Sequence, residues 1–438
     1  MKWRAIVAIL CAYGFLKEFK PSEPYLYQFQ NEDLNLTAEV LNDQVYPYWT
    51  YSYLIALIPV FLLTDLLLYK PVLLLESLCY VAVWLTLLFG RTIWSQQLGQ
   101  LFYGWASATE IAYYSYIYAK VDKEKFQRVT SFTRAAVQGG KCFAYLLSQP
   151  ILSFHWGTYW TLNYISLGSV STIFFFALLL PRVEWKVVAH NDTVEHRESP
   201  PPHLHPIQLP QTYRQFVLFR TTKLWQDFKR IYSNAFICKW SLWWALATCG
   251  TLQIGNYIQT LWGTVQEGLN DADVYNGLTE AVTTALGTIT ILLMQLVHVR
   301  WEKWGEIVLT VISLIDCALL ILLSQLHNMW IMYVAYICYR VFYQMMITIA
   351  QFNLARKLQT ESYGLLFGFN TFIALGLQTL LTFAVDDERG FQLPIRKQFI
   401  VYGAYHGAIA TIFFITGVVT RMRISRRAST AITPEIKY

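Results

Sequence analysis

A carboxylate stands in the middle of a long apolar stretch, with two phenols on the same side of the expected helix. Glu110 lies within residues 95–119, and Tyr113 and Tyr114 follow three and four residues later, which places all three on one helix face. An ionisable group among apolar residues is costly, so it indicates either a functional role or an internal partner. A carboxylate flanked by phenols suits a flat, cationic ligand that donates hydrogen bonds. The alternative is a carboxylate paired with an internal arginine or lysine.

Further aromatic side chains could enclose such a ligand. Tyr46, Trp49 and Tyr53 fall on one face at helical spacing, near the start of the apolar stretch 50–69. The face of each ring attracts a cation by about 0.5–2 kcal/mol. The alternative for each ring is an aromatic belt at a membrane interface, where Trp and Tyr are enriched.

Three polar residues elsewhere are candidates for the same site. Glu23 lies between two prolines, where a broken helix could aim its carboxylate inward. Asn276 stands near the start of a later apolar stretch. Arg340 is a second costly charge, which either contacts the ligand or pairs with an acid such as Glu110 or Glu280.

Signatures of enzyme chemistry are missing from the sequence. There is no nucleophile elbow, no glycine-rich phosphate loop with a lysine and no zinc motif. We therefore expect no catalytic residues, no cofactor and no metal site. The net charge of +6 arises from basic residues between apolar segments, so a nucleic-acid partner is not needed to explain it.

The composition is that of a membrane protein. Hydrophobic residues make up 55% of the 438 residues and charged residues only 14%, against roughly 25% charged residues in soluble domains. A bilayer span takes about 20 mostly apolar residues, and twelve such stretches follow one another. They lie at residues 3–26, 50–69, 72–91, 95–119, 131–152, 158–181, 235–262, 275–298, 304–325, 328–354, 360–385 and 396–420. The sequence therefore predicts an all-α membrane protein embedded in a lipid bilayer.

Charge alternates between the loops that separate these stretches. Basic residues gather after the second, fourth, eighth, tenth and twelfth stretches, and acidic residues gather after the first and the seventh. The positive-inside rule then places both termini in the cytoplasm. The first acidic loop carries Asn35-Leu36-Thr37, a glycosylation sequon on the outer side. We expect a multi-pass protein of the plasma membrane that is glycosylated at Asn35.

The spans divide into two groups of six. The expected parts are an N-terminal half at 1–181, a cytoplasmic linker at 182–234, a C-terminal half at 235–421 and a cytoplasmic tail at 422–438. Six plus six helices around a central linker is the plan of the major facilitator fold, whose two halves face each other across a site near the bilayer midplane.

Several motifs resemble those of the reduced folate and thiamine carrier family. They are KPSEP at 20–24, WTYSYL at 49–54, PVFLLTD at 59–65, LNYISL at 162–167, FGFNTF at 367–372 and QFIVYG at 398–403. The likeness runs from about residue 13 to residue 420, and the motifs are specific as a set. The resemblance implies a major facilitator fold of twelve helices that carries a water-soluble vitamin across a membrane.

The resemblance also bears on the substrate. Folate carriers have an arginine where this chain has Glu110 and a lysine where Gln378 aligns, whereas their arginine in the tenth span matches Arg340. Thiamine carriers have a carboxylate that matches Glu110 and faces the aminopyrimidine of thiamine. Their aromatic residues that match Trp49 and Tyr113 enclose the ligand. The resemblance is therefore stronger to the thiamine transporters.

We interpret the chain as a secondary transporter of thiamine that works by alternating access. Glu110 is expected to accept hydrogen bonds from the aminopyrimidine. The other expected substrate contacts are the rings of Tyr46, Trp49, Tyr113 and Tyr114 and the polar groups of Glu23, Asn276 and Arg340. Because Arg340 matches the folate carriers, a folate transporter of the same family is the alternative. A vitamin receptor that does not transport is a further one.

Overall fold

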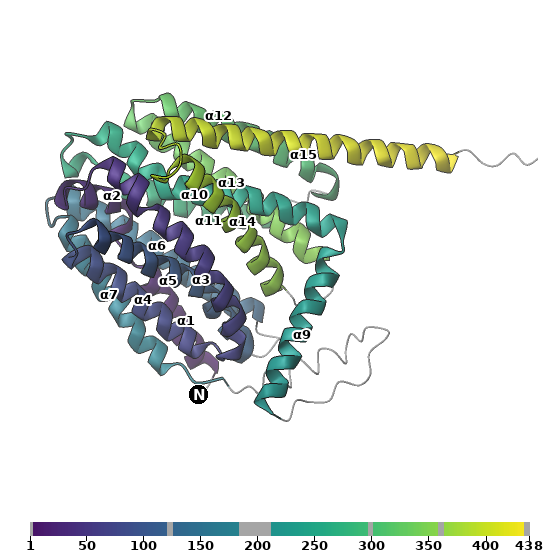
Figure 1. Cartoon of the computed structure of the whole chain (residues 1–438), viewed down its shortest axis with the longest axis horizontal. Helices are drawn as coiled ribbons and strands as arrows, with labels where there is room; N and C mark the ends of the chain where they lie inside the picture. Colours follow the sequence, from purple (N-terminus) through teal and green to yellow (C-terminus); the bar gives the residue numbers. More distant parts are fainter. Residues whose placement is uncertain (1–2, 121–125, 184–211, 297–300, 358–362, 433–438) are drawn as a thin grey trace, which may run out of the picture.

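The computed structural model describes residues 3–120, 126–183, 212–296, 301–357 and 363–432, which fold into helices joined by short turns (Figure 1). The N-terminal elements are α1 (Trp3–Glu18), η1 (Glu23–Tyr25), α2 (Leu26–Gln28), η2 (Phe29–Asp33), η3 (Val40–Val45), α3 (Pro47–Leu66), α4 (Lys70–Phe89), α5 (Ile93–Lys120), α6 (Phe126–Ser153) and α7 (Tyr159–Leu179). The later elements are α9 (Tyr213–Tyr232), α10 (Ala235–Gln266), η5 (Asp271–Asp273), α11 (Asn276–Leu296), α12 (Trp301–Gln325), α13 (Met329–Lys357), α14 (Tyr363–Val385) and α15 (Ile395–Ile432).

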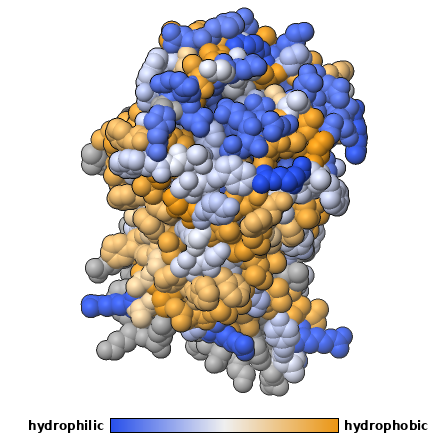
Figure 2. Space-filling model, turned by 90° about the vertical axis from the view of Figure 1, so that its left-hand side faces the viewer, coloured by the Kyte–Doolittle hydropathy of each residue, from blue (hydrophilic) through white to orange (hydrophobic). Residues whose placement is uncertain are grey.

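A long helix occupies each of the twelve stretches that the sequence predicts to span a membrane. Six of the described helices are long and apolar enough to cross a membrane by length and composition alone: α4, α7, α11, α12, α14 and α15. Figure 2 shows one face on which apolar side chains form a broad band, with hydrophilic side chains gathered above it. Many large apolar side chains are exposed, among them Phe89, Phe175 and Leu292. Water disfavours an apolar surface of this extent, and lipid accepts it.

The helices form two groups that lie side by side. The purple and blue group in Figure 1 holds α1 to α7, and the teal to yellow group holds α10 to α15. Within the first group α5 packs against both α3 and α4, and within the second α12 packs along α15. The two groups meet where α6 lies against α11 and where α3 lies against α14.

The first predicted span is interrupted, as its prolines indicate. Helix α1 ends at Glu18, and the chain continues through the short turns η1, α2 and η2. Proline has no backbone N–H and its ring clashes with the preceding helical turn, so Pro21 and Pro24 prevent a continuous helix there. The break leaves polar residues at the end of α1 inside the fold, where Lys17 and Lys20 are both buried.

Two helical segments go beyond the sequence prediction. The predicted linker contains α9, which begins at a reciprocal cap: Gln215 N–H donates to the Thr212 hydroxyl at 3.3 Å, and the Gln215 side chain accepts from Thr212 N–H. The remainder of the linker, residues 184–211, lies outside the described residues. Helix α15 continues to Ile432, well into the segment expected to be a tail.

The acidic loops lie at one end of the bundle, which we call the acidic end. Two tyrosines of the first half bond to the second half there. Tyr25 Oη donates to the Val274 carbonyl at 3.2 Å, and Tyr51 Oη donates to an Asp387 carboxylate oxygen at 2.5 Å. The backbone N–H of Glu388 donates to the carbonyl of Asp43 at 3.3 Å.

Amide side chains add to these bonds between the halves. Gln259 Nε2 donates to the backbone carbonyl of Glu23 at 2.8 Å, and its Oε1 accepts from Tyr27 N–H at 3.1 Å. Gln28 Nε2 donates to Gln266 Oε1 at 2.5 Å. We call these bonds and those of the preceding tyrosines the acidic-end seal, because together they hold the two halves closed at that end.

Gly140 permits close packing of α1 on α6. A Cβ on Gly140 would lie 2.1 Å from the backbone oxygen of Phe15, whereas a Cβ on the neighbouring Gly139 would lie 3.9 Å from its nearest atom. The first distance is far inside van der Waals contact and involves backbone, so α1 or α6 would have to move. Only glycine at residue 140 permits this approach.

We therefore predict opposite effects for two adjacent substitutions. Gly140→Ala should lower the free energy of unfolding by about 1–3 kcal/mol, the usual cost of overpacking. Gly139→Ala should leave it unchanged or raise it by up to about 1 kcal/mol, because alanine is the better helix former. Thermal unfolding of the two purified variants in detergent measures the difference, and equal melting temperatures would contradict the packing described here.

Candidate functional site

Glu110 is paired with a lysine of the first helix. Its Oε1 lies 3.2 Å from Lys17 Nζ, across 93 residues of sequence. The Lys17 side chain is fully buried, but the Glu110 side chain keeps 43% of its surface exposed. Glu110 therefore has the internal basic partner that the sequence analysis gave as the alternative. Part of its carboxylate nevertheless remains accessible.

A second carboxylate shares the same lysine. Glu76 on α4 is fully buried, and its Oε1 lies 3.3 Å from Lys17 Nζ. Its other oxygen accepts a hydrogen bond of 2.6 Å from Tyr13 Oη. One ammonium thus faces two carboxylates, and the three charged groups carry a formal charge of −1. We call Lys17, Glu76 and Glu110 the shared-lysine cluster.

Tyr113 supports this cluster instead of standing open beside it. Its side chain is fully buried, and its hydroxyl donates to the Leu10 carbonyl at 2.8 Å. Its ring stacks on Tyr13 at 5.6 Å between centroids, and Lys17 Nζ lies 5.3 Å from its centre. The ring of Tyr113, which the sequence predicts to enclose a ligand, therefore packs α5 against α1 in this structure. The side chain of Tyr114 lies outside the described part.

Trp49 lies beside the helix that carries Glu110. It is half-buried on α3, and its Nε1 donates to Ser107 Oγ at 3.2 Å. Ser107 precedes Glu110 by three residues on α5, so the indole lies on the helix side that carries the carboxylate. Its centroid is 5.7 Å from that of Tyr53, another half-buried ring.

Glu23 is held by its own neighbours in the break after α1. One carboxylate oxygen lies 2.6 Å from Lys20 Nζ and accepts from Tyr103 Oη at 2.5 Å, and the other accepts from Tyr145 Oη at 2.9 Å. Lys20 Nζ also lies 4.9 Å from the ring centre of Tyr80. Such complete pairing indicates an anchor for the broken helix, not a free polar edge for a ligand.

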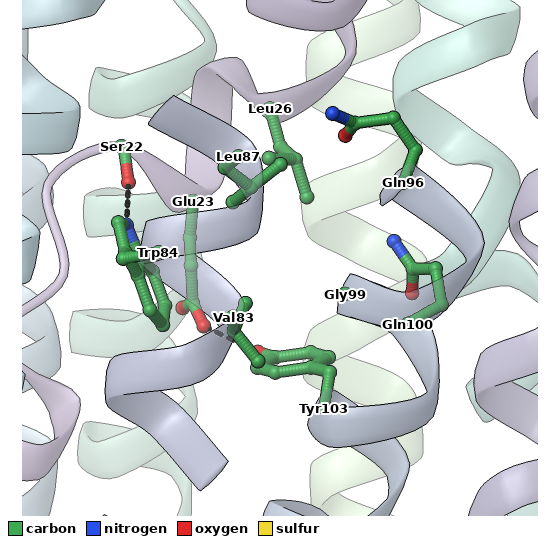
Figure 3. A pocket seen from close by; sticks show the side chains of 10 residues that line it. All are labelled: Ser22, Glu23, Leu26, Val83, Trp84, Leu87, Gln96, Gly99, Gln100 and Tyr103. Carbon is green, nitrogen blue, oxygen red and sulfur yellow. Dashed lines mark hydrogen bonds between the residues drawn. The ribbon is translucent and has the colours of Figure 1, made fainter. Parts of the chain in front are cut away.

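A small cavity lies next to this anchor (Figure 3). Its volume is about 20 Å³, which is room for about one water molecule. The hydrogen-bonded pair of Glu23 and Tyr103 lies at its edge, and Gln96 and Gln100 line it from α5, the helix that also carries Tyr103. The cavity is too small for a vitamin-sized ligand, whose pockets start at about 300 Å³.

Tyr46 and Asn276 belong to the acidic end. Tyr46 is buried and donates to Gln30 Oε1 at 3.0 Å. Asn276 is fully buried, and its Oδ1 accepts from Gln266 Nε2 and from Tyr333 Oη, both at 2.8 Å. Both predicted ligand contacts are thus engaged in internal hydrogen bonds beside the acidic-end seal.

Arg340 lies on α13 in the second half and is half-buried. The centre of its guanidinium is 6.0 Å from the ring centre of Tyr336, whose hydroxyl donates to Glu280 Oε1 at 2.8 Å. Tyr336 therefore lies between Arg340 on the same helix, α13, and Glu280 on α11. The arginine retains accessible surface, as Glu110 does in the first half.

The motifs and the fold agree with a comparison of sequences. A sequence model described as the reduced folate carrier matches residues 1–401. The chain belongs to the reduced folate carrier family. This is a family of transporters, so the chain is not an enzyme.

Named members of the reduced folate carrier family align over nearly the whole chain. Folate-like transporter 3 of Caenorhabditis elegans is 45% identical over 94% of this chain and 96% of its own length. Folate transporter 1 of the same species is 41% identical over 99% and 96%. Thiamine transporter 1 of Mus musculus is 39% identical over 97% and 92%. The expected greater closeness to thiamine transporters is not supported, because the relatives named for folate are more similar.

Solved structures share the fold. The nucleoside transporter NupG superposes with a TM-score of 0.64 at 12% identity, covering 94% of this chain and 99% of NupG. The POT family transporter PepTSo superposes with a TM-score of 0.65 at 12% identity, covering 96% and 99%. At this identity the likeness concerns the fold alone, and it confirms the predicted major facilitator fold.

Sequence reasoning missed the partners of Glu110. Glu76 lies within the apolar stretch 72–91, so the rule that singled out Glu110 also applies to it. Lys17 follows Tyr13 by four residues on one helix face, a spacing that was visible in the sequence. The sequence did not reveal that these residues from three helices come together, because such contacts depend on how the helices pack.

Removal of the shared lysine should destabilise the protein. Lys17→Met leaves two inward-facing carboxylates without their cation, and breaking a buried ion pair costs about 3–5 kcal/mol. Thermal unfolding in detergent should show a large loss for Lys17→Met and none for Lys397→Met, which removes an exposed lysine. Adding Glu76→Gln to Lys17→Met should recover part of the loss. A Lys17→Met protein as stable as the control would show that the cluster contributes little.

Proposed function

We propose that this carrier moves a water-soluble vitamin across a membrane by alternating access, and that the charge of its site favours thiamine. The observation that supports a cationic substrate is the shared-lysine cluster. Its formal charge of −1 and the exposed part of Glu110 offer a carboxylate to an incoming cation. Thiamine has a fixed positive charge on its thiazolium and hydrogen-bond donors on its aminopyrimidine.

The geometry suggests how Glu110 could take up such a ligand. When a ligand approaches Glu110, Lys17 still has Glu76 at 3.3 Å, so the ammonium does not lose its only partner. Trp49 is half-buried and fixed through Ser107, one helical turn from Glu110. A flat ring could therefore stack on the indole while its amino group donates to the carboxylate.

Folate is the second candidate, and the comparisons favour it over thiamine. The relatives at 45% and 41% identity are named for folate. Arg340 could pair with a carboxylate of an anionic substrate, because arginine binds carboxylates in a bidentate way. Against this, an anion near Glu110 would meet a cluster whose formal charge is negative.

We also propose the orientation and the state of the carrier. Basic loops in the cytoplasm place the acidic end outside the cell. The acidic-end seal then closes the outer side, which supports an inward-facing state in which Glu110 is reached from the cytoplasm. Asn35 is exposed in the loop after η2, where a glycan has room.

Side-by-side uptake of labelled thiamine and labelled folate tests the substrate. Cells that express the chain should accumulate thiamine saturably, and internal thiamine should accelerate entry of the label. Glu110→Gln removes the charge but keeps the shape, so thiamine transport should weaken by roughly one to two decades, the equivalent of about 1.5–3 kcal/mol. Glu267→Gln, an exposed acid at the end of α10, is the matched control.

Three outcomes would change the assignment. Uptake of folate without thiamine would select folate and turn attention to Arg340. Normal thiamine transport by Glu110→Gln would make Glu110 structural. Binding of a vitamin to the purified protein without flux in proteoliposomes would favour a receptor.

Glycosylation tests the orientation. If the acidic end is outside, treatment with a glycosidase should reduce the apparent mass of the parent and have no effect on Asn35→Gln. Tags at either terminus should be reached by antibodies only after permeabilisation. A mass shift that persists in Asn35→Gln but disappears in Asn191→Gln, which removes the other sequon, would reverse the orientation.

A further inference from the structure

Helix α9 lies crosswise at the end of the bundle opposite the acidic end. Figure 1 shows it running across the direction of α15, which projects from the bundle on the same side. Tyr213, its first residue, donates its hydroxyl to the carbonyl of Leu66, the last residue of α3, at 2.5 Å. At the other end Tyr232 Oη donates to Asn370 Oδ1 at 2.9 Å, near the start of α14. Helix α9 therefore joins the first half to the second.

These contacts place α9 at the boundary of the membrane. The apolar span within α14 runs from Leu365 to Val385, and the ring of Phe369 near its start packs on Phe228 of α9, with 4.9 Å between the centroids. Leu66 ends α3, and its apolar neighbour Leu67 is exposed. A helix that touches the ends of two spans lies at the depth of the lipid headgroups.

One strip of α9 is exposed although it carries apolar side chains. Leu218 is 61% exposed and Trp225 is 58% exposed, and they lie seven residues apart on one helix face. Two exposed cations extend the strip, Arg214 four residues before Leu218 and Lys229 four residues after Trp225. Lys229 Nζ lies 5.0 Å from the ring centre of Trp225. We call these four residues the α9 strip.

The α9 strip is separate from the face that holds the helix on the bundle. Leu224 and Phe228 pack against the core of the second half, and Ile231 is buried in it. With about 100° of rotation per residue, the strip lies roughly 100° around the helix from that packed face. It therefore faces sideways along the end of the bundle, where the surrounding lipid begins.

The chemistry of the α9 strip fits the boundary of a bilayer with anionic headgroups. Tryptophan is enriched at membrane interfaces, and a lysine next to it can extend its ammonium toward the headgroups. Residues 213–232 contain five basic residues and one acidic residue, so the helix has a formal charge of +4 that an anionic surface attracts. Apolar residues flanked by cations are typical of helices that lie in the membrane interface.

We propose that the α9 strip binds anionic phospholipids of the adjoining leaflet. Leu218 and Trp225 insert between the lipids, and Arg214 and Lys229 contact their phosphate groups. The proposal does not depend on which vitamin is carried. In the orientation proposed above, this leaflet is the cytoplasmic one. Because α9 bonds to both halves, lipids on the strip hold the segment that joins them.

Hydrogen–deuterium exchange of the full-length protein in nanodiscs tests this surface. Nanodiscs of phosphatidylcholine alone are compared with nanodiscs of an equal mixture of phosphatidylcholine and phosphatidylglycerol. Amides of a helix exchange when it opens locally, so bound lipid should slow exchange within residues 213–232. The mixture should slow it by roughly thirtyfold, about fivefold for each of the two cations of the strip. Exchange in α12 should be the same in both lipids.

Variants separate the charged from the apolar part of the strip. Arg214→Gln with Lys229→Gln should remove the difference between the lipids. The matched control, Arg389→Gln with Lys397→Gln, neutralises two exposed basic residues at the acidic end and should keep the difference. Leu218 is exposed, so Leu218→Gln should fold, and loss of this apolar anchor should speed exchange of α9 by about tenfold in both lipids.

Four results would overturn the proposal. Equal exchange of α9 in the two lipids would exclude a preference for anionic headgroups and leave the strip to a protein partner. A difference that persists in Arg214→Gln with Lys229→Gln would place the lipid elsewhere. Unchanged exchange in Leu218→Gln would show that this side chain does not enter the lipid. Inorganic phosphate that slows exchange in phosphatidylcholine as much as phosphatidylglycerol does would indicate a site for free anions.

Discussion

One ammonium between two carboxylates determines the arrangement of the N-terminal half. Lys17 and Glu76 are fully buried, so neither charge has water to stabilise it and each depends on the other. Lys17 lies in the last turn of α1, Glu76 in α4 and Glu110 in α5, so the cluster fixes three helices relative to one another. Deleting one carboxylate would leave a neutral pair, whereas deleting the lysine would leave two anions in apolar surroundings.

The position of α1 in turn determines how the two halves meet. Directly after α1, Lys20 pairs with Glu23, which also accepts from Tyr103 and Tyr145. This anchor holds the backbone of Glu23, whose carbonyl accepts from Gln259 of the other half. An ion pair inside one half therefore positions a hydrogen bond of the acidic-end seal. Opening that end would break bonds between the halves while leaving the ion pairs of α1 intact, which suits two halves that rock as rigid bodies.

The sequence predicted the helices well because spans of about 20 apolar residues and the prolines after α1 are local signals. It predicted less of the site, because side-chain partners come from packing. The helical spacing placed Tyr113 on the same helix face as Glu110. It could not predict that the Tyr113 hydroxyl would bond to Leu10 on another helix. Asn276 was predicted from its type and place, yet it bonds to Gln266 and Tyr333 at the acidic end. Among the predicted rings whose side chains the structure describes, Trp49 keeps both exposure and proximity to the helix face that carries Glu110.

Glu110 sets the sign of the formal charge of the shared-lysine cluster. With Glu110 present, the cluster has a formal charge of −1, and an arginine at the same position would change it to +1. Such a reversal would turn attraction into repulsion for a cation and repulsion into attraction for an anion. Arg340 lies in the other half, where its guanidinium is 6.0 Å from the ring centre of Tyr336, and the hydroxyl of Tyr336 donates to Glu280. The first half therefore carries a cluster of negative formal charge, and the second half carries an arginine with accessible surface.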